Sequence, residues 1–126
     1  MKILLVDANP EVERVLCAFL RMNGIQQYIV HWARDLFQAE FLIIEETYQI
    51  IVLDEAAVPA GAHFHTCPFT DIPRAHSANK ILLTTQEQIV RPHWAFSVWR
   101  KNRLASDCVQ ADQLVQYPVE QISSIS

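Results

Sequence analysis

The sequence contains only two glycines, Gly24 and Gly61, among its 126 residues. A loop that cradles phosphate or a dinucleotide needs several glycines, because its backbone must approach the ligand closely. No run of apolar residues approaches the roughly 20 that span a bilayer. Three widely spaced cysteines (Cys17, Cys67 and Cys108) are an odd number, which suits a reducing cytoplasm better than a disulfide scaffold. These absences disfavour most nucleotide enzymes, a membrane-spanning protein and a disulfide-rich secreted domain.

Positive charge is also scarce, with 10 lysines and arginines against 14 aspartates and glutamates and a formal net charge of −4. Domains that bind nucleic acid usually carry a clear basic excess. The short basic run "WRKNR" (99–103) is therefore interpreted as a solvated helix face and not as a nucleic-acid site. Hydrophobic residues make up 51% of the chain and charged residues 19%, a composition typical of a folded domain. A single domain over residues 1–126 is expected.

Alternating apolar patterns predict strands and helices in turn along the chain. Short aliphatic runs predict strands at 2–6, 28–32, 49–53 and 80–85, and "SDCVQ" (106–110) a fifth. Apolar residues at helical spacing predict helices over 10–23 and 35–47, and a last helix that opens at Pro118. Strands that alternate with helices in this way form βαβ units. The expected fold class is therefore α/β: a doubly wound, five-stranded parallel sheet with flanking helices.

Two stretches interrupt this alternation. Residues Glu55–Asn79 contain three prolines that break any helical register, so an irregular segment is predicted in place of the third helix. A continuous helix from residue 61 to residue 72 is not expected. The stretch Gln86–Arg103 is predicted to be helical in part, with Thr85 and Gln88 as a possible capping box.

The irregular segment carries His63, His65, Cys67 and His76, residue types that bind zinc. Structural zinc sites usually pair their ligands at CxxC-like spacings, and this stretch lacks such pairs. It is therefore interpreted as a loop that bears histidines and not as a metal site.

Polar side chains stand at the ends of three predicted strands: Asp7 after the first, Asp54 after the third and Thr84 at the end of the fourth. The carboxyl ends of parallel strands lie at one edge of the sheet, where ligands usually bind. The ordered motifs "ILLVDAN", "HWARDLFQAEFL", "IIVLDE" and "ILLTT" resemble the receiver domain of bacterial response regulators, a CheY-like, flavodoxin-like fold. This resemblance covers nearly the whole chain.

The resemblance implies a role for each of these side chains. Asp54 matches the aspartate that accepts a phosphoryl group from a partner histidine kinase. Asp7 and Asp54 match ligands of a divalent metal, and Thr84 matches the hydroxyl that bonds the phosphoryl oxygens. The family leads us to expect signalling through contacts with a kinase or an output domain, and not an enzymatic activity.

Two positions depart from the family's pattern. Ala8 stands where the family has a second acidic residue, so only weak magnesium binding at Asp7 and Asp54 is predicted. With the fifth strand at "SDCVQ", the position of the family's lysine falls near Ala111, and no lysine follows Lys101. The expected function is therefore that of a degenerate receiver that acts through protein contacts more than through regular phosphorylation.

The aromatic residues Trp94, Phe96 and Trp99 are candidates for partner binding, because aromatics are enriched at interface hot spots. On this interpretation Trp99→Ala disrupts partner binding, whereas Asp54→Asn leaves the output largely intact. The oligomeric state is left open, with a dimer possible.

Two alternatives remain open from the sequence. One is an active receiver phosphorylated at Asp54 despite its incomplete metal site. The other is a flavodoxin-like domain that binds a small ligand and uses the loop Ala56–Asn79 as a lid.

Overall fold

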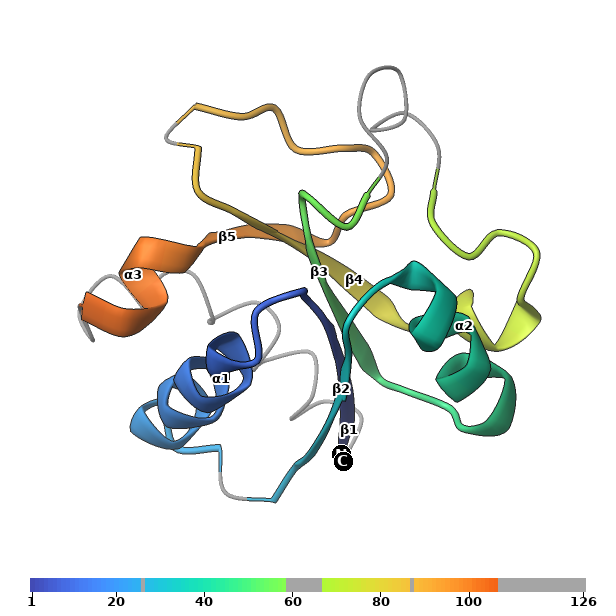
Figure 1. Cartoon of the computed structure of the whole chain (residues 1–126), viewed down its shortest axis with the longest axis horizontal. Helices are drawn as coiled ribbons and strands as arrows, with labels where there is room; N and C mark the ends of the chain where they lie inside the picture. The colour runs from blue at the N-terminus through green and yellow to red at the C-terminus, as the bar shows by residue number, and fades with distance from the viewer. Residues whose placement is uncertain (26, 59–66, 87, 107–126) are drawn as a thin grey trace.

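The computed structural model describes residues 1–25, 27–58, 67–86 and 88–106. Five strands form one sheet in the order β2-β1-β3-β4-β5, and every neighbouring pair is parallel. The strands are β1 (Lys2–Val6), β2 (Ile29–Ala33), β3 (Ile50–Asp54), β4 (Asn79–Thr84) and β5 (Ser97–Arg100). Figure 1 shows this twisted sheet with helices on both of its faces. The predicted α/β class and the five-stranded parallel sheet are confirmed.

The central strands β1, β3 and β4 are almost entirely buried, and most of their residues are aliphatic. Helices cover both faces of a parallel sheet, so side chains that point either way along a central strand leave water. Strand β2 is an edge strand, and four of its five residues are exposed or half-buried. The continuous aliphatic runs in the sequence thus correspond to the middle of the sheet.

Two helices connect the first three strands. Helix α1 (Glu11–Met22) buries one apolar stripe, places two glutamates in its first turn and ends before Gly24, whose φ is +80°. A positive φ is accessible to glycine without steric cost, so Gly24 suits the helix end. Helix α2 (Leu36–Glu45) begins after Asp35, whose carboxylate accepts a hydrogen bond from the Gln38 amide at 2.9 Å. Both helices lie within the ranges predicted for them.

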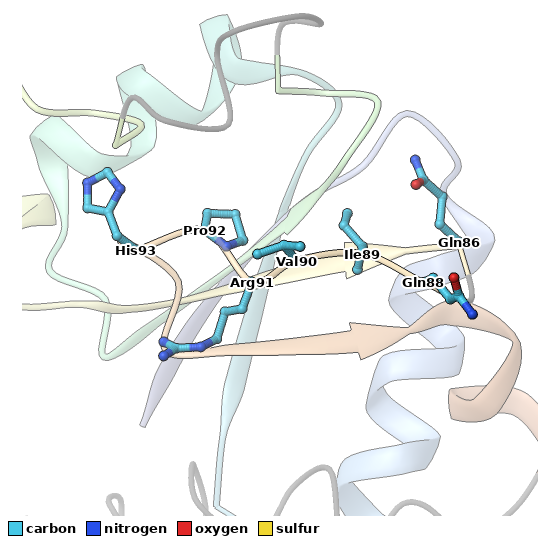
Figure 2. Close-up of a pocket in the computed structure, with 7 residues that line it drawn as sticks. All are labelled: Gln86, Gln88, Ile89, Val90, Arg91, Pro92 and His93. Atoms are coloured by element: carbon cyan, nitrogen blue, oxygen red, sulfur yellow. The ribbon is translucent and has the colours of Figure 1, made fainter.

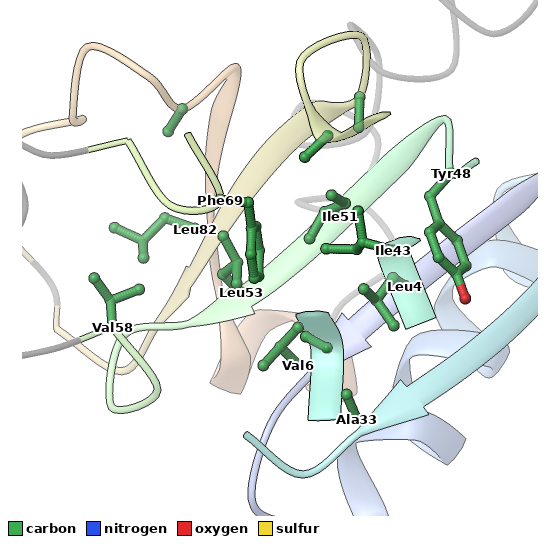
Figure 3. Packing of buried hydrophobic residues seen from close by; sticks show 14 residues of the cluster. Leu4, Val6, Ala33, Ile43, Tyr48, Ile51, Leu53, Val58, Phe69 and Leu82 are labelled. Carbon is green, nitrogen blue, oxygen red and sulfur yellow. The ribbon is translucent and has the colours of Figure 1, made fainter. Parts of the chain in front are cut away.

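The core has two parts, one on each face of the sheet. One part packs α1 and α3 (Lys101–Ser106) against side chains of β1, β3, β4 and β5. The other packs α2, Tyr48 and the irregular segment, including Phe69, against the opposite face, as Figure 3 shows. Each βαβ connection therefore covers the sheet from a defined side.

Between β3 and β4 the described residues form turns and a three-residue 3-10 helix, η2 (Pro73–Ala75). Residues 67–72 are not helical, which agrees with the prediction that no continuous helix runs from 61 to 72. His63 and His65 lie outside the described residues.

Most of the region after β4 differs from its prediction. Of the described residues of 86–103, only 101–103 are helical, as the start of α3. Among the described residues of 85–96 no helix forms, and the proposed capping box is wrong because the Thr85 hydroxyl donates to Glu55 at 3.1 Å. The fifth strand of the sheet is Ser97–Arg100, and α3 follows it directly. Of the strand predicted at 106–110, only Ser106 is described, and it ends α3. Pro92 accounts for the absence of a helix in the described residues between β4 and β5, since a proline breaks the helical register. The predicted helix after Pro118 lies outside the described residues.

Candidate functional site

Four polar side chains meet at the carboxyl edge of the sheet. Asp7 follows β1, Asp54 ends β3, Thr84 ends β4 and Lys101 follows β5. Their strands are consecutive neighbours in the sheet, so the topology alone brings the four chain positions together. Sequence analysis predicted that Asp7, Asp54 and Thr84 would converge, and it missed Lys101.

Lys101 lies between the two aspartates. Its Nζ is 2.7 Å from Asp7 Oδ2 and 2.8 Å from Asp54 Oδ1. The Asp7 and Asp54 side chains are only 2% and 9% exposed, and that of Lys101 is 22% exposed. One ammonium thus partly neutralises two carboxylates in a site that is largely shielded from water, where ion pairs interact strongly.

The environment shifts the pKa of two groups. Burial raises the pKa of Asp54 above its ordinary value, and the Asp7 charge adds to this, although hydrogen bonds from Lys101 and the Ala56 amide oppose it. Burial alone would lower the pKa of Lys101, but hydrogen bonds and charges from Asp54 and Asp7 outweigh burial and raise it. Lys101 is therefore held in its charged form, whereas ionised Asp54 is less favourable in the folded protein than in water.

Several backbone and side-chain contacts fix Asp7. The Asn9 amide donates to Asp7 Oδ1 at 2.9 Å, and the Trp32 indole N–H donates to the Asp7 main-chain carbonyl at 2.8 Å. The Asp7 amide donates to the carbonyl of Ala33 at 3.0 Å. Strand β2 therefore positions the aspartate that follows β1.

Thr84 and Glu55 border the site on the β4 side. Thr84 is fully buried, and its hydroxyl oxygen accepts a hydrogen bond from the Gln86 amide at 3.0 Å. The Glu55 carboxylate accepts hydrogen bonds from the amide and hydroxyl of Thr85 and from the Gln86 side chain. Glu55 thus ties the loop after β3 to the loop after β4.

The prediction that the site lacks a lysine is wrong. It rested on a fifth strand at 106–110, which moved the expected lysine position to Ala111, a residue outside the described part of the chain. With β5 at Ser97–Arg100, the residue that follows the strand is Lys101. A usable signal was present in "SVWRK": a short alternating stretch with a lysine directly after it.

The donor set for a divalent metal is small. Asp7 and Asp54 supply carboxylate oxygens of the kind that magnesium prefers, and the exposed Ala8 supplies none. In the described part of the chain, no group of three or more His, Cys, Asp or Glu side chains could hold a metal ion. The two aspartates therefore fit a hard cation as ligands, but with fewer donors than a tight site needs.

The aromatic candidates occupy different environments. Trp99 is 1% exposed, lies in β5 and packs on Phe19 with ring centroids 5.4 Å apart. The hypothesis that Trp99 anchors a partner is not supported by this position, because a core side chain offers no surface for docking. Trp94 and Phe96 are half-buried, and their role in partner binding stays a prediction.

A hollow of about 460 Å³ opens beside the end of β4. Its lining residues all belong to the segment between β4 and β5: Gln86, Gln88, Ile89, Val90, Arg91, Pro92 and His93 (Figure 2). Arg91 donates a hydrogen bond to the Ala95 carbonyl and so holds this segment in a loop. The hollow differs from the ligand site considered from the sequence, which used the loop 56–79.

No protein-family model and no curated protein matches the sequence. Solved structures do match. One is the N-terminal domain of a response regulator/sensory box/GGDEF three-domain protein from Carboxydothermus hydrogenoformans, with a TM-score of 0.67 and 15% identity over 98% of both chains. A second is a CheY-like response regulator receiver domain protein from Methanospirillum hungatei JF-1, with a TM-score of 0.62 and 15% identity over 99% of this chain and 98% of that one.

A third similar structure is a response regulator from Burkholderia pseudomallei with a phosphorylated aspartic acid and a calcium ion. It has a TM-score of 0.59 and 17% identity, and the match covers 98% of this chain and 71% of that chain. At these identities the matches establish the fold, and the chain has the CheY-like fold of response-regulator receiver domains.

Proposed function

We propose that this chain is a receiver-type signalling module of a two-component pathway and that Asp54 is its phosphoryl acceptor. The observation that carries the proposal is the contact of Lys101 with both Asp7 and Asp54 at 2.7 and 2.8 Å. A fixed cation beside the acceptor is what phosphoryl transfer requires, because negative charge accumulates on the transferred group.

Each residue has a defined task in the proposed reaction. An Asp54 carboxylate oxygen attacks the phosphorus of the donor, and the bond from phosphorus to the leaving group breaks as the new oxygen–phosphorus bond forms. The Lys101 ammonium balances the charge of the phosphoryl group. The Thr84 hydroxyl, now bonded to the Gln86 amide, would donate to a phosphoryl oxygen from the neighbouring strand end.

Asp7 and Asp54 would hold the divalent metal that such a reaction uses. When bound, the metal neutralises charge on the phosphoryl oxygens and on the carboxylates. Binding is expected to be weak, because Ala8 supplies no ligand and Lys101 already pairs with both carboxylates. The similar Burkholderia structure carries a calcium ion and a phosphorylated aspartic acid, which supports the same chemistry here.

The proposed partners follow from the proposed role. A histidine kinase would supply the phosphoryl group, and an output domain or a separate protein would respond to it; the module itself signals and is not a conventional enzyme. We place it in the cytoplasm as a single domain over 1–126. Within the described residues, no helix has the length and apolar character to cross a membrane.

Phosphorylation by acetyl phosphate, measured by intact mass, tests the proposal. The purified protein is expected to gain the mass of one phosphoryl group in the presence of magnesium, and Asp54→Asn is expected to gain none. Ala8→Asp adds a carboxylate at an exposed position next to Asp7 and should increase the rate and lower the magnesium requirement. No mass gain in the native protein and in Ala8→Asp would refute the proposal.

A second candidate is the degenerate receiver, and Ala8 together with the two-carboxylate donor set favours it. In this case the module signals without regular phosphorylation. It is distinguished by a native protein that stays unmodified while Ala8→Asp becomes phosphorylated, because restoring one ligand then restores the reaction.

A further inference from the structure

Helix α2 has a second apolar face that points away from the sheet. Ala39 and Ile43 are buried against the sheet, whereas Phe37, Phe41 and Ile44 are 68%, 59% and 59% exposed. Spacings of four and three residues place these three on one side of the helix. Figure 1 shows α2 at the outside of the molecule, on the face of the sheet opposite α1.

The exposed stripe is already ordered. The rings of Phe37 and Phe41 pack edge to face, with centroids 5.1 Å apart and an interplanar angle of 84°. Such pairing reduces the side-chain freedom that binding would otherwise remove. On α1, by contrast, the solvent side carries charged residues such as Glu11 and Arg14, which are 65% and 81% exposed. Exposed apolar side chains gathered on one side of a helix are typical of interaction sites.

The charges at the two ends of α2 indicate what docks there. Arg34 lies just before the helix and is 62% exposed, with its nearest acid, Asp35, at 4.0 Å. Glu45 ends the helix and is also exposed. In an antiparallel pair of α2 helices around a two-fold axis, the Arg34 end of one copy meets the Glu45 end of the other twice. A parallel pair would instead bring like charges together.

We propose that the stripe Phe37–Phe41–Ile44 is a self-association surface on which α2 of a second copy packs antiparallel, with reciprocal Arg34–Glu45 ion pairs. One short helix per copy buries little area, so the dimer is weak and forms with rising protein concentration. Glu40 lies beside the middle of the stripe, near the two-fold axis. Its two copies repel each other and weaken the dimer further.

Sedimentation velocity over a concentration series tests the surface. Phe41→Ser is expected to raise the dissociation constant by roughly tenfold or more, because it removes a central aromatic contact. Val90→Ser is the matched control: Val90 is 90% exposed but lies outside the stripe, so this variant should associate like the native protein. Glu40→Gln should associate more tightly.

Charge exchange tests the antiparallel geometry. Arg34→Glu and Glu45→Arg should each weaken self-association, although both changes suit the helix dipole and should preserve α2. An equimolar mixture of the two variants should restore association, because each copy then meets an opposite charge at both ends. Circular dichroism verifies the fold of each variant.

Three results would overturn the proposal. One is a native protein that stays monomeric at every concentration. This result would overturn the proposal even if another part of the chain covers the stripe. Another is a dimer that Phe41→Ser and Val90→Ser affect equally. The third is a mixture of charge variants that fails to associate, which would indicate a different surface, or one that associates far more tightly than the native protein, which would indicate a parallel pair.

Discussion

Lys101 and Lys80 are both largely buried, but their surroundings affect their charge in opposite ways. Lys101 contacts two carboxylates at the carboxyl edge of the sheet, and these partners raise its pKa. Lys80, in β4, is 5% exposed, and its Nζ donates to the Ala75 carbonyl at 2.7 Å. Burial lowers the pKa of Lys80, and the nearby Cys67 only partly opposes this shift.

The comparison shows that the partner, more than burial itself, decides what a buried charge does. A carboxylate offsets the loss of solvation of an ammonium, whereas a single carbonyl dipole offsets less of it. The charge of Lys101 is thus stabilised in the fold, as the proposed phosphoryl transfer requires. The charge of Lys80 destabilises the fold, because its lost solvation is only partly offset.

The largest effect is expected from Lys101→Met, which leaves two buried carboxylates without a cation. The loss of unfolding free energy should be on the order of 3 kcal/mol, toward the low end for a buried pair because 22% of the Lys101 side chain is exposed. Urea unfolding at pH 7 measures it. In an Asp54→Asn background the same substitution should cost clearly less; equal costs in both backgrounds would contradict the pairing.

We next expect the contributions of Lys101 and Lys80 to the unfolding free energy to change in opposite directions as pH rises into the alkaline range. The folded pKa of Lys101 is raised, so its stabilisation is complete below its ordinary value of 10.5 and is lost only as pH rises through the higher folded value. The folded pKa of Lys80 is lowered, so its penalty is relieved as pH rises from that value toward 10.5.

Unfolding free energies of the native protein, Lys80→Met and Lys101→Met between pH 7 and pH 11 distinguish these behaviours. The unfolding free energy of the native protein should increase relative to that of Lys80→Met as pH rises toward 10.5. Its excess over that of Lys101→Met should persist until the pH exceeds 10.5. Parallel curves for the two variants would refute the comparison.

A smaller effect is expected from Asp54→Asn, which should stabilise the protein at pH 7. The folded pKa of Asp54 is raised above 3.8, so the native protein binds a proton more readily than the unfolded chain between those two values. Its stability therefore falls as pH rises through this window, and the advantage of Asp54→Asn is complete only above it. Denaturation at pH 4 and pH 7 measures the difference, and a destabilised Asp54→Asn at pH 7 would contradict it.

The smallest effect should come from Lys80→Met at pH 7. Removing a poorly compensated charge offsets the loss of one hydrogen bond, so the unfolding free energy should change by less than about 1 kcal/mol. Phosphorylation of Asp54 by acetyl phosphate should be unchanged. A loss similar to that of Lys101→Met would mean that the Lys80 charge has a partner beyond the Ala75 carbonyl.

The sequence predicted the part of the fold whose residues follow simple patterns. The aliphatic runs of β1, β3 and β4 are long enough to identify buried strands, and the stripe of α1 identifies an amphipathic helix. Because strand ends of a parallel sheet lie side by side, Asp7, Asp54 and Thr84 could be brought together without coordinates.

The prediction from the sequence was wrong at β5, and this error also caused one residue of the site to be missed. Ser97–Arg100 is a four-residue strand with an arginine and a large aromatic, a composition that also suits an amphipathic helix. Its parallel pairing with β4 shows that this stretch belongs to the sheet, and the packing of Trp99 on Phe19 buries its aromatic side chain. When a strand is predicted at the wrong place in the chain, the residue that follows it is also misassigned. Lys101 was missed for this reason.

The position of Lys101 in the chain also has a consequence for folding during synthesis. Asp7 and Asp54 emerge from the ribosome long before Lys101, and β5 is the edge strand that is made last. A nascent sheet of the first four strands would hold the two carboxylates without their cation and would expose Phe19, which packs on Trp99 in the complete fold. The arrival of β5 therefore supplies both the counter-charge and the aromatic packing at once, which couples completion of the fold to assembly of the site.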